Sequence, residues 1–136
     1  MPQKITLSSR QLLEEARRNI EEIAVADAIA LVDDDSVILV DLRDPRELAR
    51  DGTVPGAFHC PRGMLEFWID PESPYFKPRF NEDKKYVFFC GGGLRSILAA
   101  EVAQRMGLKP VAHIIGGFAD WRKAGGPIDA YEPKQH

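Results

Sequence analysis

Three short apolar runs, at residues 36–41, 86–89 and 111–115, constrain most strongly what this chain can fold into. They are rich in β-branched and aromatic residues, which is typical of strands that are covered on both faces. Helical patterns follow the three runs, at residues 45–50, after Cys90 and at 117–124. Alternating strands and helices indicate an α/β fold with an open, mostly parallel sheet and helices on both faces.

Weaker patterns complete the expected domain. Residues 22–25 and 57–60 are plausible short strands, which makes a five-stranded sheet, and residues 26–32 are a plausible apolar helix. Another helix begins with Ser8 as its cap and Gln11 three residues later, and it runs to about Asn19. We therefore expect an N-terminal helical extension over 1–20, one domain over 21–130 and a C-terminal tail over 131–136.

Residues 61–81 interrupt the regular pattern. They contain four prolines among several large apolar side chains, including Phe67, Trp68 and Tyr75. A loop of this length is uncommon in a compact domain and is a candidate functional wall or interface. The alternative is that the segment covers one edge of the sheet.

Composition narrows the classes of function. The chain has 136 residues and a net charge of −3, which gives no reason to expect nucleic acid or an anionic membrane as a partner. No apolar run approaches the roughly 18 residues of a membrane span. The first residues lack the apolar core of a signal peptide, and two cysteines without a secretion signal favour free thiols in a reducing compartment. We expect a cytoplasmic protein.

The candidate active site is the loop Cys90-Gly91-Gly92-Gly93-Leu94-Arg95-Ser96, which joins the second apolar run to a helix. Open α/β sheets bind ligands beyond the carboxyl ends of their strands. Three glycines leave the backbone N–H groups unobstructed, so these groups and the helix N-terminus favour negative charge on the sulfur. We predict that Cys90 is a reactive nucleophile and that residues 91–96 bind its substrate.

Three charged residues are candidates for supporting roles. Asp41 and Arg43 lie at the end of the first apolar run, and Arg62 follows the predicted strand at 57–60. Arg43 could add positive potential beside the loop or brace its geometry. The alternative is a solvated charged turn with little energetic weight.

The remaining cysteine and histidine give weaker signals. Cys60 is better explained by core packing than by a role as a resolving thiol. His113 lies within an apolar run and is interpreted as structural, so the sequence identifies no base for Cys90. We expect no metal, because two isolated cysteines lack ligand spacing, and no nucleotide cofactor, because no acidic residue follows the next strand.

Four motifs in order resemble the rhodanese (sulfurtransferase) family over about residues 20–128. Residues 40–47 contain an Asp-x-Arg with a later Glu, and residues 52–57 resemble a Gly-His-Ile-Pro-Gly-Ala signature with Thr53 in place of histidine. We interpret Thr53 as a turn residue. Residues 90–96 are similar to the family's active-site loop, and residues 116–127 to its closing Gly-Gly, Trp and Gly-x-Pro pattern.

The resemblance implies a three-layer α/β/α domain that transfers sulfur through a persulfide on Cys90, without a metal or cofactor. The donor would be thiosulfate or a persulfide, and the acceptor would be cyanide, a small thiol or a protein thiol. Such two-step covalent catalysis predicts ping-pong kinetics. The plain glycine loop does not identify the physiological donor.

Two alternatives remain open at this point. Related phosphatases and arsenate reductases carry Cys-x5-Arg, whereas Cys90 and Arg95 form Cys-x4-Arg, a tighter ring that favours a single sulfur atom. A rhodanese-like domain can also serve as a binding or sensing module without catalysis. The intact Cys90 disfavours that hypothesis.

Overall fold

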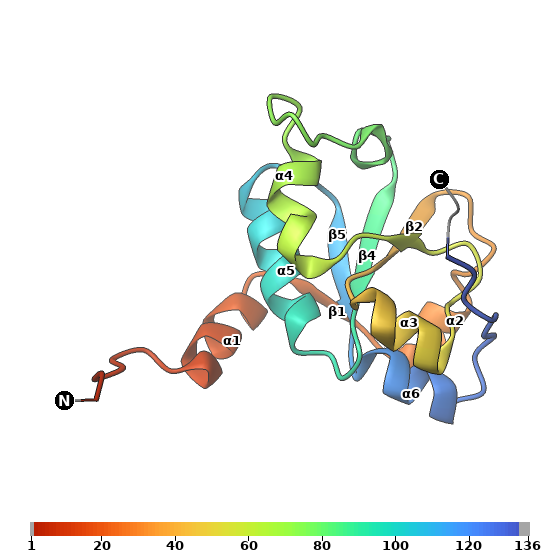
Figure 1. The fold of residues 1–136 in the computed structure, drawn as a ribbon, viewed down its shortest axis with the longest axis horizontal. Coiled ribbons are helices and arrows are strands. Elements are labelled where there is room, and N and C mark those ends of the chain that lie inside the picture. Colours follow the sequence, from red (N-terminus) through yellow and green to blue (C-terminus); the bar gives the residue numbers. More distant parts are fainter. Residues whose placement is uncertain (1, 134–136) are drawn as a thin grey trace.

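A computed structural model describes residues 2–133 of the protein. A five-stranded parallel sheet lies at the centre of the fold (Figure 1). The strand order is β1-β5-β4-β2-β3, and every pairing between these strands is parallel. The strands are β1 (Glu21–Ile23), β2 (Val37–Asp41), β3 (Phe58–His59), β4 (Lys85–Phe89) and β5 (Val111–Ile114). The predicted α/β class is confirmed, and the sheet is wholly rather than mostly parallel.

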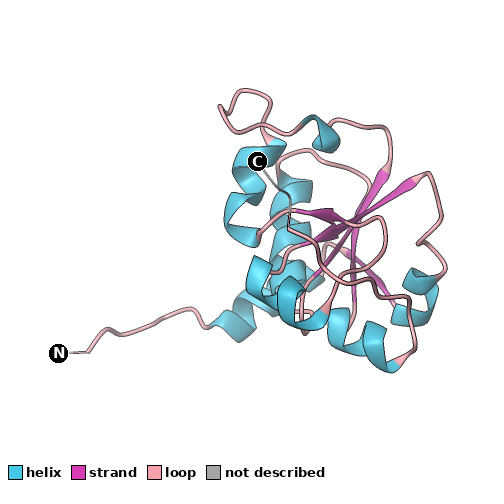
Figure 2. Ribbon diagram, turned by 45° about the vertical axis from the view of Figure 1, so that its right-hand side comes forward, coloured by secondary structure: helices cyan, strands magenta, loops and turns pink. Residues whose placement is uncertain are grey.

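Helices cover both faces of the sheet (Figure 2). They are α1 (Ser9–Arg17), α2 (Val25–Ile29), α3 (Pro45–Asp51), α4 (Leu65–Ile69), α5 (Arg95–Arg105) and α6 (Gly117–Lys123). One apolar cluster joins α4 and α5 to β2 and β4, and a second joins α2 and α6 to the opposite face. Since each strand of the centre contributes to both clusters, the apolar runs are continuous in the sequence.

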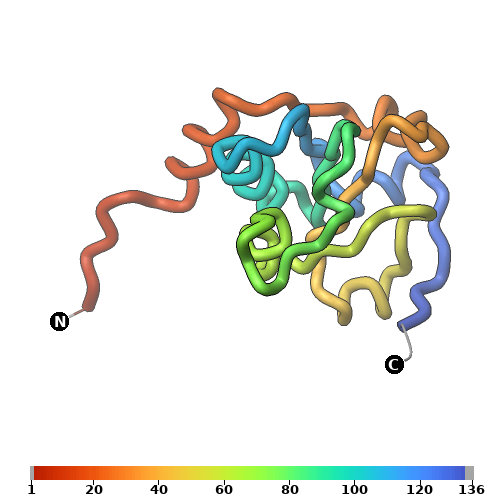
Figure 3. The backbone as a smooth tube through the Cα atoms, turned by 90° about the horizontal axis from the view of Figure 1, so that it is seen from above, coloured from red at the N-terminus to blue at the C-terminus, as the bar shows by residue number. Residues whose placement is uncertain are grey.

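The N-terminal helix is confirmed, and its start follows the predicted capping chemistry. Ser8 caps α1 by accepting a hydrogen bond from the Gln11 amide, and the Gln11 side chain accepts one from the Ser8 amide. Helix α1 packs against α5, and the chain before it leads away from the domain (Figure 3). Met1 of the predicted extension and residues 134–136 of the predicted tail lie outside the described residues.

The expectation of an irregular loop over 61–81 is wrong in part. This segment contains 3-10 turns at Arg62–Met64 and Pro78–Phe80 as well as α4. Helices this short carry no readable periodicity, which is why the sequence concealed them. Trp68 and Phe80 pack against Phe58 of the edge strand β3, with ring centroids 5.9 and 5.3 Å away, so the segment contacts that strand. Phe67 and Tyr75 are exposed.

The two-sided burial of β4 makes a stability prediction. Phe88 is fully buried, and Phe88→Ala should lower the free energy of unfolding by about 3–5 kcal/mol, because it leaves a cavity beneath α5. Phe67 is 52% exposed, and the matched change Phe67→Ala should cost no more than about 0.5 kcal/mol. Urea unfolding of both variants measures the difference, and equal costs would contradict the placement of β4 at the centre.

Candidate active site

Cys90 follows β4 directly, and α5 begins five residues later. The Cys90 side chain is 1% exposed and belongs to the apolar cluster on the α5 side of the sheet. Its Sγ accepts a hydrogen bond from the Gly93 N–H at 3.2 Å. Gly92 and Leu94 are exposed and form the outer part of the loop. The Cys90 sulfur is therefore enclosed by the loop of residues 91–96, which the sequence analysis predicts to bind substrate.

The backbone of this loop is attached to the N-terminus of α6. The Phe118 N–H donates to the Cys90 carbonyl at 2.7 Å, and the Ala119 N–H donates to the Gly91 carbonyl at 3.0 Å. These carbonyls satisfy N–H groups that a helix N-terminus otherwise leaves unpaired. In a trans peptide the N–H points opposite to the C=O, so the N–H groups of Gly91 and Gly92 point away from α6. The attachment thus fixes the direction of the loop amides.

Two glycines permit this close approach. Gly117 has φ +59°, and a Cβ there would collide with the Cys90 carbonyl. Gly93 has φ +97°, and a Cβ there would lie 2.9 Å from the Gly116 nitrogen. Both positions therefore require glycine for conformation and for space. This contact explains why a loop glycine and a Gly-Gly pair distant in the sequence occur together.

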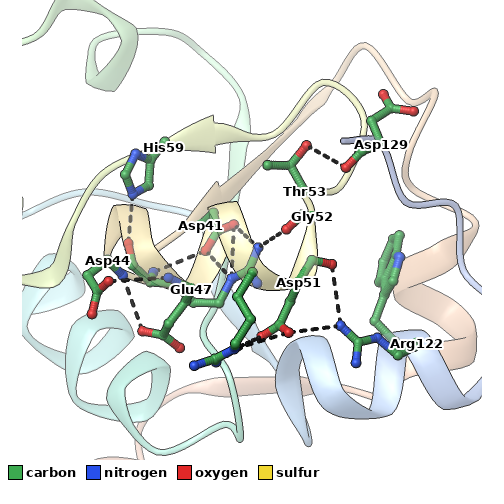
Figure 4. A network of polar contacts seen from close by, with 12 residues as sticks. Asp41, Asp44, Glu47, Asp51, Gly52, Thr53, His59, Arg122 and Asp129 are labelled. Atoms are coloured by element: carbon green, nitrogen blue, oxygen red, sulfur yellow. Dashed lines mark hydrogen bonds and ion pairs between the residues drawn. The ribbon is translucent and has the colours of Figure 1, made fainter. Parts of the chain in front are cut away.

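Arg43 connects the end of β2 to Gly52 and to α6, the helix that binds the Cys90 loop. The guanidinium is 1% exposed, donates to both oxygens of Asp41 and donates to the Gly52 carbonyl at 2.9 Å (Figure 4). The guanidinium carbon of Arg43, Cζ, lies 4.0 Å from the centroid of the Phe118 ring on α6. Among the described residues Arg43 Nη1 has no hydrogen-bond partner. These contacts join the end of β2 to Gly52 and to the Phe118 ring, and the bracing role of Arg43 stays a prediction.

Arg95 is directed to a carboxylate. Its two terminal nitrogens donate to the two oxygens of Glu47 at 2.7 and 3.0 Å, an ion pair that the sequence did not predict. The Arg95 hydrogen bond holds the pKa of Glu47 below its ordinary value, against the opposing effect of burial. Glu47 also accepts from the Asp44 amide and so completes the N-terminal cap of α3 (Figure 4). At Glu47 the alternative of a solvated charged turn does not apply, because this carboxylate links α3 to α5.

A line of polar groups leads from the sulfur to the sheet edge. Cys90 Sγ lies 3.8 Å from Ser96 Oγ, which lies 3.0 Å from His113 Nδ1. His113 Nε2 lies 2.8 Å from a carboxylate oxygen of Glu22, which also pairs with Arg17. His113 is buried and is hydrogen-bonded at both ring nitrogens. Its connection to Cys90 was missed, because three separate elements supply the partners.

The other candidates lie outside this line. Arg62 pairs with Glu66 of α4 at 2.9 Å and supplies its backbone N–H to the Leu42 carbonyl. Cys60 is fully buried, and burial raises its pKa to about 12, which suits packing rather than a resolving role. Thr53 forms a two-way backbone pair with Asp129. Its hydroxyl also donates to the Asp129 carbonyl (Figure 4), in agreement with its interpretation as a structural residue.

A cleft of about 360 Å³ lies on the outer side of the loop, against Gly91 and Gly92. Three arginines, Arg43, Arg50 and Arg122, contribute to its walls, and Asp51 pairs with the last two (Figure 4). Within residues 2–133 no three His, Cys, Asp or Glu side chains gather in a way that could hold a metal ion. Over the same residues, no helix is both long and apolar enough to span a membrane.

The sequence and the fold are similar to those of known proteins. The family model described as the rhodanese-like domain matches residues 24–124. The chain is 31% identical over 102 residues to a sulfurtransferase of Allochromatium vinosum. The match covers 75% of this chain and 87% of that protein. The chain is 33% identical over 89 residues to the thiosulfate:glutathione sulfurtransferase of Homo sapiens, with 61% and 76% covered.

A solved structure from Rhodopseudomonas palustris is similar over nearly the whole chain. It has a TM-score of 0.92 and 63% identity, and it covers 95% of this chain and 99% of that chain. That protein is of unknown function and is described as a possible tyrosine phosphatase.

The attachment of the loop to α6 predicts a large effect of a single methyl group. Gly117→Ala should lower the free energy of unfolding by about 2 kcal/mol or more, because a positive φ costs about 1–2 kcal/mol and the methyl also displaces the Cys90 carbonyl. Gly125 is the control, since it has φ +79° with no atom within 4 Å of an added Cβ. Gly125→Ala should show the conformational cost alone. Chemical unfolding compares the two, and a smaller loss for Gly117→Ala would contradict the contact.

The ion pair between Glu47 and Arg95 predicts a pH dependence of stability. The folded pKa of Glu47 lies below the ordinary 4.5, so its contribution is complete above that value and is lost as the pH falls through the folded pKa. Wild type should therefore exceed Glu47→Gln in stability at neutral pH, and the difference should shrink in acid. Thermal unfolding across this range measures it. A difference independent of pH would show that the carboxylate is not the stabilising group.

Proposed function

Because this chain belongs to the rhodanese-like family, we propose that it is a sulfurtransferase whose Cys90 carries sulfane sulfur as a persulfide. The observation that carries the proposal is the enclosed sulfur of Cys90, which accepts the Gly93 N–H inside a loop whose Cys90 and Gly91 carbonyls are bound by α6. This arrangement stabilises negative charge on sulfur without a metal ion. The similarity to two sulfurtransferases supports the same conclusion.

The reaction proceeds in two displacements. The Cys90 thiolate attacks the outer sulfur of the donor; a new S–S bond forms, the donor S–S bond breaks, and the leaving group departs with the electron pair, as sulfite from thiosulfate or as a thiolate from a persulfide. An acceptor thiolate or cyanide then attacks the outer sulfur, and the Cys90 thiolate is the leaving group. The loop amides hold the negative charge at both stages, because the same sulfur atom carries it.

The Cys90 environment favours a small reacting group. Since the side chain is 1% exposed, a donor reaches it only with a narrow terminal sulfur. We therefore propose thiosulfate and low-molecular-weight persulfides as donors, and cyanide, a small thiol or an exposed protein thiol as acceptors. The human relative, a thiosulfate:glutathione sulfurtransferase, makes glutathione the first thiol to test.

Hydrolysis of phosphate esters is the second candidate, because the Rhodopseudomonas palustris protein is described as a possible tyrosine phosphatase. Two observations weigh against it. Both terminal nitrogens of Arg95 are bound to Glu47, which neutralises the cation that a phosphate dianion would need. The loop also has one residue fewer than the Cys-x5-Arg ring of the phosphatases that it resembles.

The two cysteines provide a matched test. Cys90→Ser should reduce transfer from thiosulfate to cyanide or glutathione by about three orders of magnitude or more, because the nucleophile is lost. Cys60→Ser should retain transfer in its folded fraction, since Cys60 only packs in the core. After incubation with thiosulfate, mass spectrometry should find one added sulfur atom on Cys90 that cyanide removes.

Three results would contradict the proposal. Undiminished transfer by folded Cys90→Ser would remove Cys90 from the reaction. Hydrolysis of para-nitrophenyl phosphate by wild type, with no persulfide after donor treatment, would favour the phosphatase. A folded wild type that gives neither product would favour a binding or sensing module.

A further inference from the structure

We propose that Ser96 and His113 form a proton relay that removes the proton of the Cys90 thiol, with Glu22 fixing the orientation of the imidazole. Ser96 contacts the reacting sulfur, whereas His113 and Glu22 act through Ser96 as positioning residues. The relay serves the sulfur transfer proposed above and in that sense rests on it. Its direct effect is on the ionisation of Cys90, which is measured without any sulfur donor.

The four groups form one unbroken line. The distances are 3.8 Å from Cys90 Sγ to Ser96 Oγ, 3.0 Å from Ser96 Oγ to His113 Nδ1 and 2.8 Å from His113 Nε2 to Glu22 Oε2. The first lies within the range of hydrogen bonds to sulfur, and such contacts shorten when substrate binds. Ser96 and His113 are buried and Glu22 is part-exposed, so the line runs from the enclosed sulfur to solvent.

Each group comes from a different part of the fold. Cys90 follows β4 in the β4–α5 loop, Ser96 lies in the first turn of α5, His113 lies in β5, and Glu22 lies opposite His113 in β1. The β1–β5 register sets the Glu22–His113 pair, and the packing of α5 on β5 sets the Ser96–His113 pair. The line therefore depends on the native arrangement of four elements.

Glu22 determines the direction of every hydrogen bond in the line. Its pKa is lowered, first by the hydrogen bond from His113 and further by Arg17, so it is an ionised acceptor at neutral pH. An ionised carboxylate only accepts, so His113 Nε2 carries the hydrogen. In the neutral imidazole Nδ1 is then unprotonated and accepts the Ser96 hydroxyl hydrogen. The Ser96 oxygen is left with lone pairs for the Cys90 S–H.

The proton transfer follows from these directions. The S–H bond of Cys90 breaks as its proton passes to Ser96 Oγ, while the original Ser96 hydroxyl proton passes to His113 Nδ1. The products are a thiolate that the Gly93 N–H stabilises and an imidazolium paired with the Glu22 carboxylate. A buried imidazolium is costly unless it is paired, and Glu22 supplies the pair. The reverse steps return the proton when the thiolate is released.

The charged surroundings of His113 support this assignment. The ionisable groups that reach it are Glu22 from β1, Arg17 of α1 through Glu22, and Cys90 of the β4–α5 loop through Ser96. Within residues 2–133 no other charged side chain hydrogen-bonds to His113. Glu22 satisfies His113 Nε2 and joins β1 to β5. The Ser96 hydroxyl satisfies the buried Nδ1 and at the same time connects the ring to the Cys90 sulfur.

The test is the pH dependence of Cys90 alkylation by iodoacetamide, followed by peptide mass mapping. In Ser96→Ala and His113→Gln the midpoint should move up by about one pH unit, with a roughly tenfold slower reaction near neutral pH and the same rate in alkali. Glu22→Gln should shift it in the same direction. Ser96→Thr retains the hydroxyl and should restore the wild-type midpoint.

Two controls separate a relay from a structural effect. His59→Gln changes a histidine that binds the Arg43 carbonyl instead, and it should leave the midpoint unchanged. The double variant Ser96→Ala/His113→Gln should shift the midpoint no further than either single change, because both break the same line. Additive shifts would indicate independent effects and would overturn the relay.

An unchanged alkylation midpoint in folded His113→Gln would also overturn the proposed relay. If that variant does not fold, judged by near-UV circular dichroism, Ser96→Ala and Glu22→Gln decide the matter in the same way. If the variants shift the midpoint of alkylation but the wild type transfers no sulfur, the relay is supported and the proposed function is contradicted. If the wild type transfers sulfur but the variants leave the midpoint unchanged, the proposed function is supported and the relay is contradicted.

Discussion

The contact between the Cys90 loop and the N-terminus of α6 determines the geometry of this site. The carbonyls of Cys90 and Gly91 are bound by α6, and the adjoining N–H groups are therefore directed away from that helix. A flexible glycine loop becomes a fixed set of donors because its carbonyls are anchored on one side. The loop and the Gly116–Gly117 pair are two parts of one structure, although more than twenty residues separate them.

Charged residues hold this contact in place from outside the sulfur environment. Arg43 connects Asp41 and Gly52 to the Phe118 ring of α6, so the end of β2 supports the helix that anchors the loop. Glu47 holds Arg95 and ties α3 to the start of α5. Both cations are thus paired with carboxylates, whereas the Cys90 sulfur accepts a backbone hydrogen bond from the Gly93 N–H.

The sequence was a good guide wherever neighbouring residues carried the information. The strands around Val40 and Phe88 are buried on both faces, and the resulting apolar runs predicted a parallel sheet. Ser8 and Gln11 predicted the cap of α1, and Cys90 with its glycines predicted a loop between strand and helix. Helix α4 was missed, because five residues within a proline-rich segment show no period.

The sequence by itself determined the fold class, the family motifs and the position of the Cys90 loop between a strand and a helix, because each depends on residues that are adjacent or regularly spaced. Only the tertiary structure decided which partners meet. Glu47 reaches Arg95 across 48 residues, and Glu22 reaches His113 across 91. A single histidine in an apolar strand has the same local pattern whether it only joins two strands or also serves a thiol. The difference lies in the packing of α5 over β5, which places Ser96 between His113 and Cys90.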